Sequence, residues 1–135
     1  MALENKIVSV FGSSRLLPDD PDYEEALYNL AVLDEKRSPQ RSIELLERAI
    51  QIDPDYAIAH QALGRLYQRA RDLVRAEYHF RRSLEIDPAD YWSNMYMANL
   101  LGVLGRNEEA ERTYRLAISL HPENNSRNRN VCSLP

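Results

Sequence analysis

The stretch "ERAIQIDPDYAIAH", Glu47 to His60, returns one period later as "RRSLEIDPADYWSN", Arg81 to Asn94. A third copy of its first half, "RLAISLHP", follows after another such period and ends at Pro122. The period is thirty-four, and counting backwards from Pro54 to Pro21 in "DPDYEEAL" gives one position fewer. A fixed period in this range is typical of chains built from repeated structural units. The sequence therefore predicts three copies of one unit, with one residue missing from the first.

Residues of matching size recur at matching places within the units. The small ones are Ala49, Ser83 and Ala117 in one slot, Ser42, Ala76 and Ala110 in a second, and Ala31, Gly64 and Ala98 in a third. The large ones are Leu46, Phe80 and Tyr114 in one slot and Leu30, Leu63 and Met97 in another. Small residues let two helices approach closely, and large ones fill the gap to the next unit. Because one helix pair cannot bury its apolar face alone, stacking the units would give one continuous core.

Each unit is predicted to contain two helices. Apolar residues recur at helical spacing in the first half of the second unit, at Ala59, Leu63, Leu66 and Tyr67. Asp53 followed by Pro54 is a favourable helix start, since Asp can cap free amides and Pro suits the first helical position. The second helices are predicted to begin at the turns "KRSP", "RARD" and "LGRN", with the caps Ser38, Asp72 and Asn107.

This pattern resembles the tetratricopeptide repeat family. The residues that carry the resemblance are Gly64, Tyr67, Ala76, Phe80, Ser83 and Pro88 in the second unit, and Ala98, Ala110, Tyr114, Ala117 and Pro122 in the third, together with the turn "LGRNEEAE". The first unit departs from the family pattern, because it lacks one residue and has Asp34 where an aromatic residue is usual. The resemblance implies an all-α fold: a right-handed α-solenoid of three helix hairpins.

The expected organisation has three parts. Residues 1–19 form an N-terminal arm, residues 20–122 hold the three repeats (20–53, 54–87 and 88–122), and residues 123–135 form a polar tail without ordered structure. The tail, "ENNSRNRNVCSLP", is too polar to supply the capping helix with which repeat stacks usually end. The last helix would then leave Leu116 and Leu120 uncovered, which predicts contact with a partner or a second copy through this face.

In this family the first helices of the units line a concave groove, which usually binds an extended peptide or a partner helix. The resemblance therefore implies a non-catalytic interaction scaffold with a protein or peptide partner. Residues three to four apart share one helix face. On that geometry the groove residues should be Tyr28, Val32, Ile58, Gln61, Arg65, Gln68, Trp92, Met95 and Asn99. Aromatic residues, Met and Arg are enriched at interface cores, although Trp92 and Met95 could instead pack on a neighbouring helix.

One subfamily grips the C-terminal carboxylates of chaperone tails with Lys and Asn side chains in the groove. At the matching places this chain has Tyr28, Val32, Ala62, Trp92 and Tyr96, and only Arg65 and Asn99 could stand in for that clamp. The sequence therefore predicts no chaperone-tail binding by this mode. A peptide with apolar anchors and one acidic group near Arg65 is the expected ligand.

No catalytic, cofactor-binding or metal-binding residue is predicted, and the chain is not expected to be an enzyme. Its three histidines, His60, His79 and His121, lie in three different places without the spacing of metal ligands. His60 is expected to be a helix-packing residue. Cys132 stands alone in the tail, and no serine lies in a nucleophile-elbow motif. No cofactor is implied.

Composition excludes several classes of function for this chain of 135 residues. A net charge of −4 argues against general nucleic-acid binding, which usually shows a basic footprint. A single cysteine cannot form an internal disulfide, so a reducing, cytoplasmic location is expected. No apolar run approaches the roughly 18 residues of a membrane span, so no membrane partner is predicted.

The opening stretch "KIVSVFGSSRLLPDD", Lys6 to Asp20, differs from the repeats. Residues from about 6 to 26 weakly resemble the start of the lysine-decarboxylase-like nucleotide-binding family, in which a strand leads into a Gly-Ser phosphate turn. That family needs a second glycine-rich motif, and the other three glycines here lie inside the repeats. The segment could be a loosely packed arm, a cap on the first repeat through Val8, Val10 and Phe11, or a strand that pairs with another chain. A self-assembling structural module, or an accessory remnant of a nucleotide-binding enzyme, are therefore the alternative functions.

Overall fold

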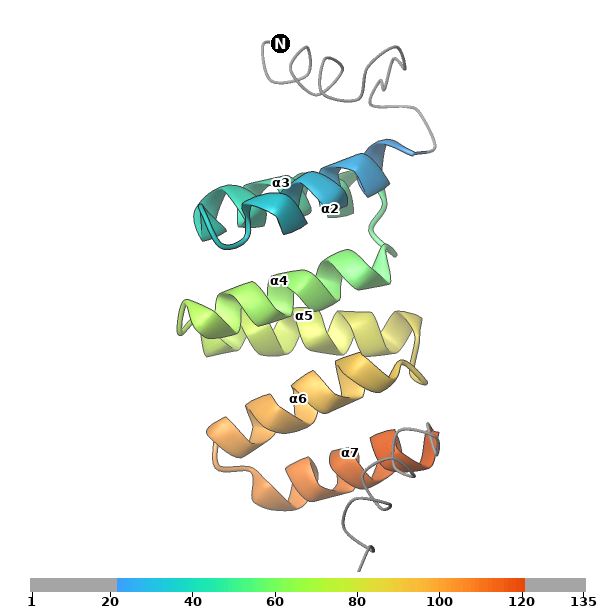
Figure 1. Ribbon diagram of the computed structural model, residues 1–135. Coiled ribbons are helices and arrows are strands. Elements are labelled where there is room, and N and C mark those ends of the chain that lie inside the picture. The colour runs from blue at the N-terminus through green and yellow to red at the C-terminus, as the bar shows by residue number, and fades with distance from the viewer. Residues whose placement is uncertain (1–21, 121–135) are drawn as a thin grey trace, which may run out of the picture. The chain divides into compact units, whose positions relative to one another are not determined.

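The computed structural model describes residues 22–120, and this part of the chain is all-α (Figure 1). Its six helices form three pairs: α2 (Tyr23–Asp34) with α3 (Pro39–Ile52), α4 (Ala57–Arg69) with α5 (Leu73–Ile86), and α6 (Tyr91–Val103) with α7 (Asn107–Leu120). The prediction of an all-α helical-repeat fold is confirmed. The predicted arm, the nucleotide-turn resemblance up to Asp20 and the polar tail lie outside the described residues.

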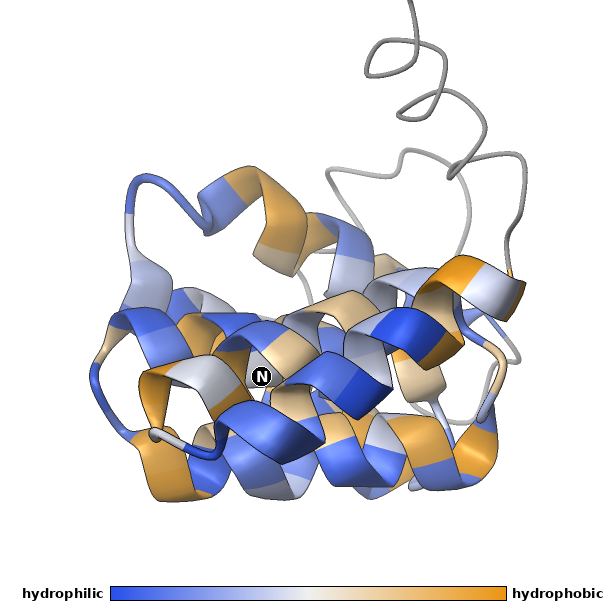
Figure 2. Ribbon diagram, turned by 90° about the horizontal axis from the view of Figure 1, so that it is seen from below, coloured by the Kyte–Doolittle hydropathy of each residue, from blue (hydrophilic) through white to orange (hydrophobic). Residues whose placement is uncertain are grey.

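The described part of the chain divides between residues 59 and 60 into two compact units, which are distinct from the three repeats of the sequence. The boundary falls within the first turn of α4, so the first unit holds α2 and α3 and the second holds the rest of α4 with α5, α6 and α7. Hydrophobic and hydrophilic residues alternate within single helices (Figure 2), as expected for helices that bury one face.

Small buried residues join the two helices of the first unit. Ala31 on α2 and Ala49 on α3 are at most 1% exposed. Between them, the Ser42 hydroxyl donates a 2.7 Å hydrogen bond to the backbone oxygen of Ala31. A second bond runs from Arg48 Nη2 to the hydroxyl of Tyr23, at 3.0 Å. These small residues therefore allow α2 and α3 to approach closely, as the sequence predicts. The hydroxyl of the buried Ser42 is paired with the backbone of the facing helix.

The absence of a side chain at Gly64 on α4 makes room for Phe80 on α5. A Cβ atom added at Gly64 would lie 2.5 Å from two ring carbons of Phe80, which is far inside van der Waals contact. Phe80 is fully buried, and so are Ala76 and Ser83 on the same helix. The small slots at positions 64, 76 and 83 thus fit the aromatic ring between the two helices.

The first helices begin later than the sequence predicts. Asp53 ends α3 and its Oδ1 accepts a 3.1 Å hydrogen bond from the amide of Asp55, while α4 begins at Ala57. Asp87 does the same with the amide of Ala89 at 3.2 Å, before α6. Both Asp-Pro pairs in the described part of the chain therefore form an Asx-type turn between repeats, because the carboxylate bonds its own backbone two residues ahead. The prediction that Asp53 caps the following helix was wrong.

The cap predicted at Asp72 is confirmed, since its side chain accepts a 3.2 Å bond from the amide of Arg75. Ser38 takes the N-cap place of α3 without a side-chain capping bond, and Asn107 is the first residue of α7 itself. The turns before α5 and α7 are each closed by a backbone bond, from Asp72 to Tyr67 and from Arg106 to Leu101, both at 2.9 Å.

Candidate functional site

A cleft of about 440 Å³ opens in the second unit between α4, the start of α5 and α6. It is lined by Arg65, Gln68, Arg69, Arg71, Leu73, Tyr96, Asn99 and Val103, and we call it the arginine cleft. Three of these residues are arginines, and no carboxylate lies among the described residues that line it. Guanidinium groups are planar forks of donors that match carboxylates, so this cleft is suited to anionic groups.

Helical spacing on α4 and the turn that follows it bring the cationic side chains together. Arg65 and Arg69 are one turn apart on α4, and Arg71 follows in the turn to α5. The Arg65 guanidinium is half-buried and lies 5.7 Å from the ring centroid of Tyr96 on α6, which is within cation–π range. Arg69 and Arg71 are exposed.

A side-chain hydrogen bond joins the two helices that border the cleft. Gln68 Nε2 on α4 donates to Asn99 Oδ1 on α6 at 3.0 Å. Three residues predicted for the groove, Arg65, Gln68 and Asn99, therefore line one cleft. Apolar surface comes from Val103, which is 53% exposed, beside the Tyr96 ring. The cleft thus offers positive charge, amide groups and apolar contact together.

The other predicted groove residues on α4 and α6 have different surroundings. Gln61 donates to Asp90 Oδ2 and to Ser93 Oγ, both at 2.9 Å, so its amide holds the start of α6. Trp92 is 56% exposed, and its ring centroid lies 5.1 Å from that of Tyr91 and 6.2 Å from that of Tyr96. Met95 is half-buried.

The remaining predicted residues, Tyr28, Val32 and Ile58, belong to the first unit. Val32 and Ile58 are 45% and 43% exposed. Tyr28 contacts Tyr56 edge-on, with ring centroids 6.1 Å apart. Burial, together with the nearby charge of Glu25, raises the pKa of the Tyr56 hydroxyl to about 12, so Tyr56 stays neutral.

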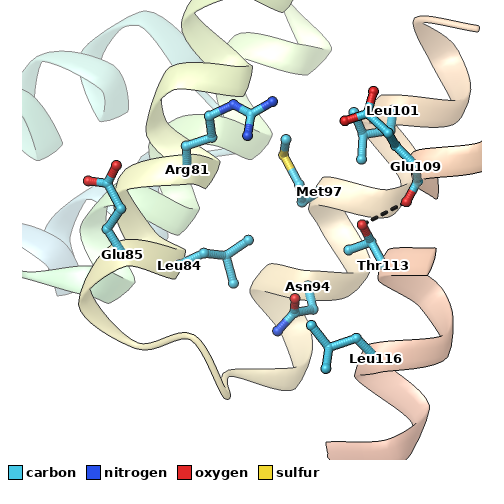
Figure 3. Close-up of a pocket in the computed structure, with 9 residues that line it drawn as sticks. All are labelled: Arg81, Leu84, Glu85, Asn94, Met97, Leu101, Glu109, Thr113 and Leu116. Carbon is cyan, nitrogen blue, oxygen red and sulfur yellow. Dashed lines mark hydrogen bonds between the residues drawn. The ribbon is translucent and has the colours of Figure 1, made fainter. Parts of the chain in front are cut away.

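A second cavity of about 320 Å³ lies between α5, α6 and α7 (Figure 3). Its lining residues are Arg81, Leu84, Glu85, Asn94, Met97, Leu101, Glu109, Thr113 and Leu116. The Thr113 hydroxyl donates to its own helix, at 2.8 Å from the backbone oxygen of Glu109. Arg81 is held by Glu77, so the charged groups at this rim already bond within the protein. The residues that line this cavity include both arginine and glutamate, so the cavity does not gather charge of one sign as the arginine cleft does.

The turn from α6 to α7 is fixed by an ion-pair network. Arg106 bonds the carboxylate of Glu109 through two nitrogens, at 2.6 and 3.0 Å, and reaches Glu77 on α5 at 2.9 Å. Although burial opposes ionisation, hydrogen bonds from Arg81 and Arg106 hold the pKa of Glu77 below its usual range. These acids are occupied structurally, and we assign them no role in binding.

Two histidines that were predicted to lie in different places, His60 and His79, contact each other in the structure. His60 on α4 and His79 on α5 are 3% and 5% exposed, and their Nδ1 atoms are 3.0 Å apart. Tyr67 stacks on His79 at 5.6 Å with an angle of 8° between the rings. One imidazole must donate and the other accept. The prediction that His60 packs between helices is therefore confirmed, and its partner was missed. The Gly64 and Phe80 slots could have indicated that these helix faces meet.

Burial, reinforced by the neighbouring His60 and Arg75, lowers the pKa of His79 to about 4. The ring is therefore neutral near pH 7. Within residues 22–120 there is no group of three or more His, Cys, Asp or Glu residues that could hold a metal ion. Each helix in the same region is too short or too polar to cross a membrane.

Comparisons with known proteins agree with this fold. Residues 57–90 match the sequence model of the tetratricopeptide repeat. Anaphase-promoting complex subunit 3 of Schizosaccharomyces pombe is 24% identical over 91 residues, which are 66% of this chain and 13% of the relative. This chain therefore corresponds to a small part of that relative's length.

Solved structures share the helical arrangement at low sequence identity. A crystal structure of MamA has a TM-score of 0.70 at 22% identity, over 76% of this chain and 61% of that one. A chain of the CopN–Scc3 complex has a TM-score of 0.69 at 14% identity, over 76% and 61%. The second repeat domain of Spaghetti (RPAP3), bound to an HSP90 peptide, has a TM-score of 0.68 at 16% identity, over 72% and 91%.

The sequence match covers the whole α4–α5 hairpin and its flanking turn. The hairpins before and after it carry the same small and large slots, and the solved structures share the fold. Residues 57–90 therefore match one tetratricopeptide repeat, and the described part of the chain has the helical-repeat fold of these solved structures.

Proposed function

We propose that the chain is a non-catalytic interaction module that binds an extended peptide or a partner helix, with the arginine cleft as its binding site. One observation carries the proposal: donors from α4 and α6 converge on one cleft beside Tyr96 and the exposed Val103. Arg and aromatic residues are the types that most often dominate binding energy at interfaces.

Two further observations support this function. Among proteins of similar fold, one is a member of a protein complex and another is bound to a peptide. In this chain, Trp92 is 56% exposed next to Tyr96, which itself lines the cleft. An apolar side chain of a ligand that reaches beyond the cleft could therefore contact the Trp92 ring. A cytoplasmic location stays a prediction from the single cysteine.

The proposal is tested by filling the cleft with a larger side chain. Fluorescein-labelled short peptides in neutral, acidic and basic pools are titrated with the full chain, and fluorescence anisotropy reports binding. Val103→Trp should fill the cleft and weaken the best pool by about tenfold, as expected for the loss of a buried interface contact. Val74→Trp is the matched control, because Val74 is an exposed valine on α5 that does not line the cleft. Equal affinities of the two variants, or no binding by any pool, would contradict the proposal.

Self-association through α7 is the second candidate function. Leu116 and Ile118 on this helix are 48% and 40% exposed, which favours an apolar contact. Light scattering of the same samples gives the molar mass against concentration. A dimer that persists in a Trp92→Ala variant would favour this candidate, and a monomer at all concentrations would exclude it.

A further inference from the structure

We infer that the cavity between α5, α6 and α7 is a binding site for a neutral aromatic group about the size of indole, with one N–H or O–H donor. This cavity shares no lining residue with the arginine cleft, so the inference does not depend on the proposed peptide-binding function. Three observations carry it: the correspondence between repeats, the size and apolar walls of the cavity, and two hydrogen-bond acceptors on those walls.

The first observation is the absence of three rings that the preceding hairpin has. In the α4–α5 hairpin His60, Tyr67 and His79 are buried, and the ring of Tyr67 stacks on that of His79 with centroids 5.6 Å apart. One repeat period on, smaller residues hold the corresponding positions, and all of them line the cavity: Asn94, Leu101 and Thr113. A flat aromatic ligand can therefore supply the ring that the sequence lacks here.

The second observation is the size of the cavity and the character of its walls. Its volume is about 320 Å³, whereas an apolar cavity of roughly 150 Å³ is enough to hold benzene. The space therefore admits a ligand of two fused rings. Leu84 on α5, Met97 on α6 and Leu116 on α7 give it apolar walls from three helices (Figure 3). A methionine sulfur also makes favourable contacts with aromatic rings.

The third observation is a pair of acceptors on the cavity wall. Asn94 is 2% exposed, and its Nδ2 donates to the backbone oxygens of Pro88 and Asp90, at 3.0 and 2.9 Å. Those bonds use both amide hydrogens and leave Oδ1 as an acceptor (Figure 3). The Thr113 hydroxyl donates to the backbone oxygen of Glu109 at 2.8 Å, so its oxygen can still accept. A ligand with an N–H or O–H group matches these acceptors, and one without a donor does not.

The charged residues of the cavity favour a neutral ligand. Each of the three has an ion-pair partner within the described part of the chain, at 3.1, 2.6 and 2.6 Å: Arg81 with Glu77, Glu85 with Arg82, and Glu109 with Arg106. A charged ligand would have to compete with these pairs, whereas a neutral ring would leave them in place.

The test titrates indole into the full chain carrying carbon-13 in its methionine methyl groups. The chain has three methionines, of which Met97 lines the cavity and Met95 does not. Indole should shift the Met97 methyl resonance until it saturates, with a Kd on the order of 1 mM for so small a ligand, and leave the Met95 resonance in place. Met95→Leu and Met97→Leu assign the two resonances. Benzofuran, which has the shape of indole but no N–H group, should bind roughly threefold to tenfold more weakly.

Filling the cavity gives the matched comparison. Leu101→Tyr combined with Thr113→His introduces the two rings that stack in the preceding hairpin, and should weaken indole binding at least about tenfold. Leu101→Phe alone is the milder variant, with an expected weakening of about threefold, and serves if melting curves show that the double variant does not fold. Val74→Tyr is the control, because Val74 is 82% exposed and lies outside the cavity. It should bind indole as the wild-type chain does.

The outcomes separate the parts of the inference. An unmoved Met97 resonance, or undiminished indole binding by folded Leu101 variants, would overturn the site. Equal affinity for indole and benzofuran would overturn the role of the two acceptors. N-acetyl-tryptophanamide in the same titration identifies the source of the ring: tighter binding than indole assigns the site to a tryptophan side chain of another protein, and weaker binding assigns it to a free molecule. Peptide binding in the arginine cleft is measured separately, so either result can fail alone.

Discussion

The α4–α5 hairpin and the α6–α7 hairpin follow one plan and fill it differently. His60, Tyr67 and His79 in the first correspond to Asn94, Leu101 and Thr113 in the second, each one repeat period on. In the first hairpin the two histidines bond each other and Tyr67 stacks on His79. In the second, the three counterparts line a cavity of about 320 Å³. The repeat therefore fixes which positions meet, and the residues at these positions decide whether the space is filled.

A second difference concerns the small slot. Gly64 faces Phe80, which is fully buried, whereas the next unit has Ala98 and a half-buried Tyr114 at the equivalent positions. Removing one methyl group from the small slot lets the facing ring enter the gap between the helices. The small and large slots thus vary together, which keeps each hairpin packed.

The largest expected effect tests the pair His60 and His79 of the α4–α5 hairpin. His79 has a pKa of about 4 in the folded chain, below its ordinary value of 6.5, so the unfolded chain binds more protons between these values. Stability should be complete above pH 6.5 and fall as the pH drops towards 4, by on the order of 3 kcal/mol. Urea unfolding at a series of pH values measures this loss.

A His79→Gln variant supplies the control for this pH dependence. The amide can still bond His60 but cannot titrate, so the variant should lose much less stability between pH 6.5 and 5 than the wild-type chain. Carboxylates titrate mainly below this window. Parallel curves for the two proteins would show that the buried pair does not govern acid stability.

The next effect tests the close packing at Gly64. Gly64→Ala should destabilise the chain by about 1–3 kcal/mol, because the new methyl group overlaps the buried Phe80 ring. Gly102→Ala is the matched control on α6, where an added Cβ meets nothing within 4 Å. It should instead stabilise by about 0.5–1 kcal/mol, through better helix propensity. Urea midpoints that shift in the same direction would mean that packing does not distinguish the two sites.

The smallest expected effect comes from placing a histidine pair at the corresponding positions of the α6–α7 hairpin. Asn94→His combined with Thr113→His should add a loss of about 1 kcal/mol between pH 6.5 and 5, because the cavity admits water and burial shifts the pKa less. The reference is Asn94→His alone, since Asn94 also donates to the backbone oxygens of Pro88 and Asp90, at 3.0 and 2.9 Å. If single and double variants show equal pH dependence, corresponding positions do not suffice to form the pair.

Much of the fold could be predicted because it depends on size and spacing along the chain. The small slots at Ala49, Ser83 and Ala117 are all buried, and Asp72 caps α5 as expected. The turn at Asp53 was missed because Asp followed by Pro suits a helix start and an Asx turn equally, and only the backbone decides between them.

The site was less predictable. Arg65, Gln68 and Asn99 follow from helical spacing on α4 and α6, and they do line one cleft. Arg69 falls outside that stripe, and Arg71 lies in a turn where spacing rules do not apply. The correspondence of Arg71 with Gly105, one repeat period apart, was a signal in the sequence, since glycine after a helix often marks a left-handed residue.

The bond between His60 and His79 has one further consequence, for the protons themselves. Because the two Nδ1 atoms face each other, neutral rings must adopt unlike tautomers, one with its proton on Nδ1 and the other on Nε2. Two such arrangements exist, and each reverses the direction of the bond. Interconversion would require both rings to move their protons, and it would need no movement of the helices. Nitrogen NMR of the labelled imidazoles would distinguish one fixed arrangement from an exchanging pair.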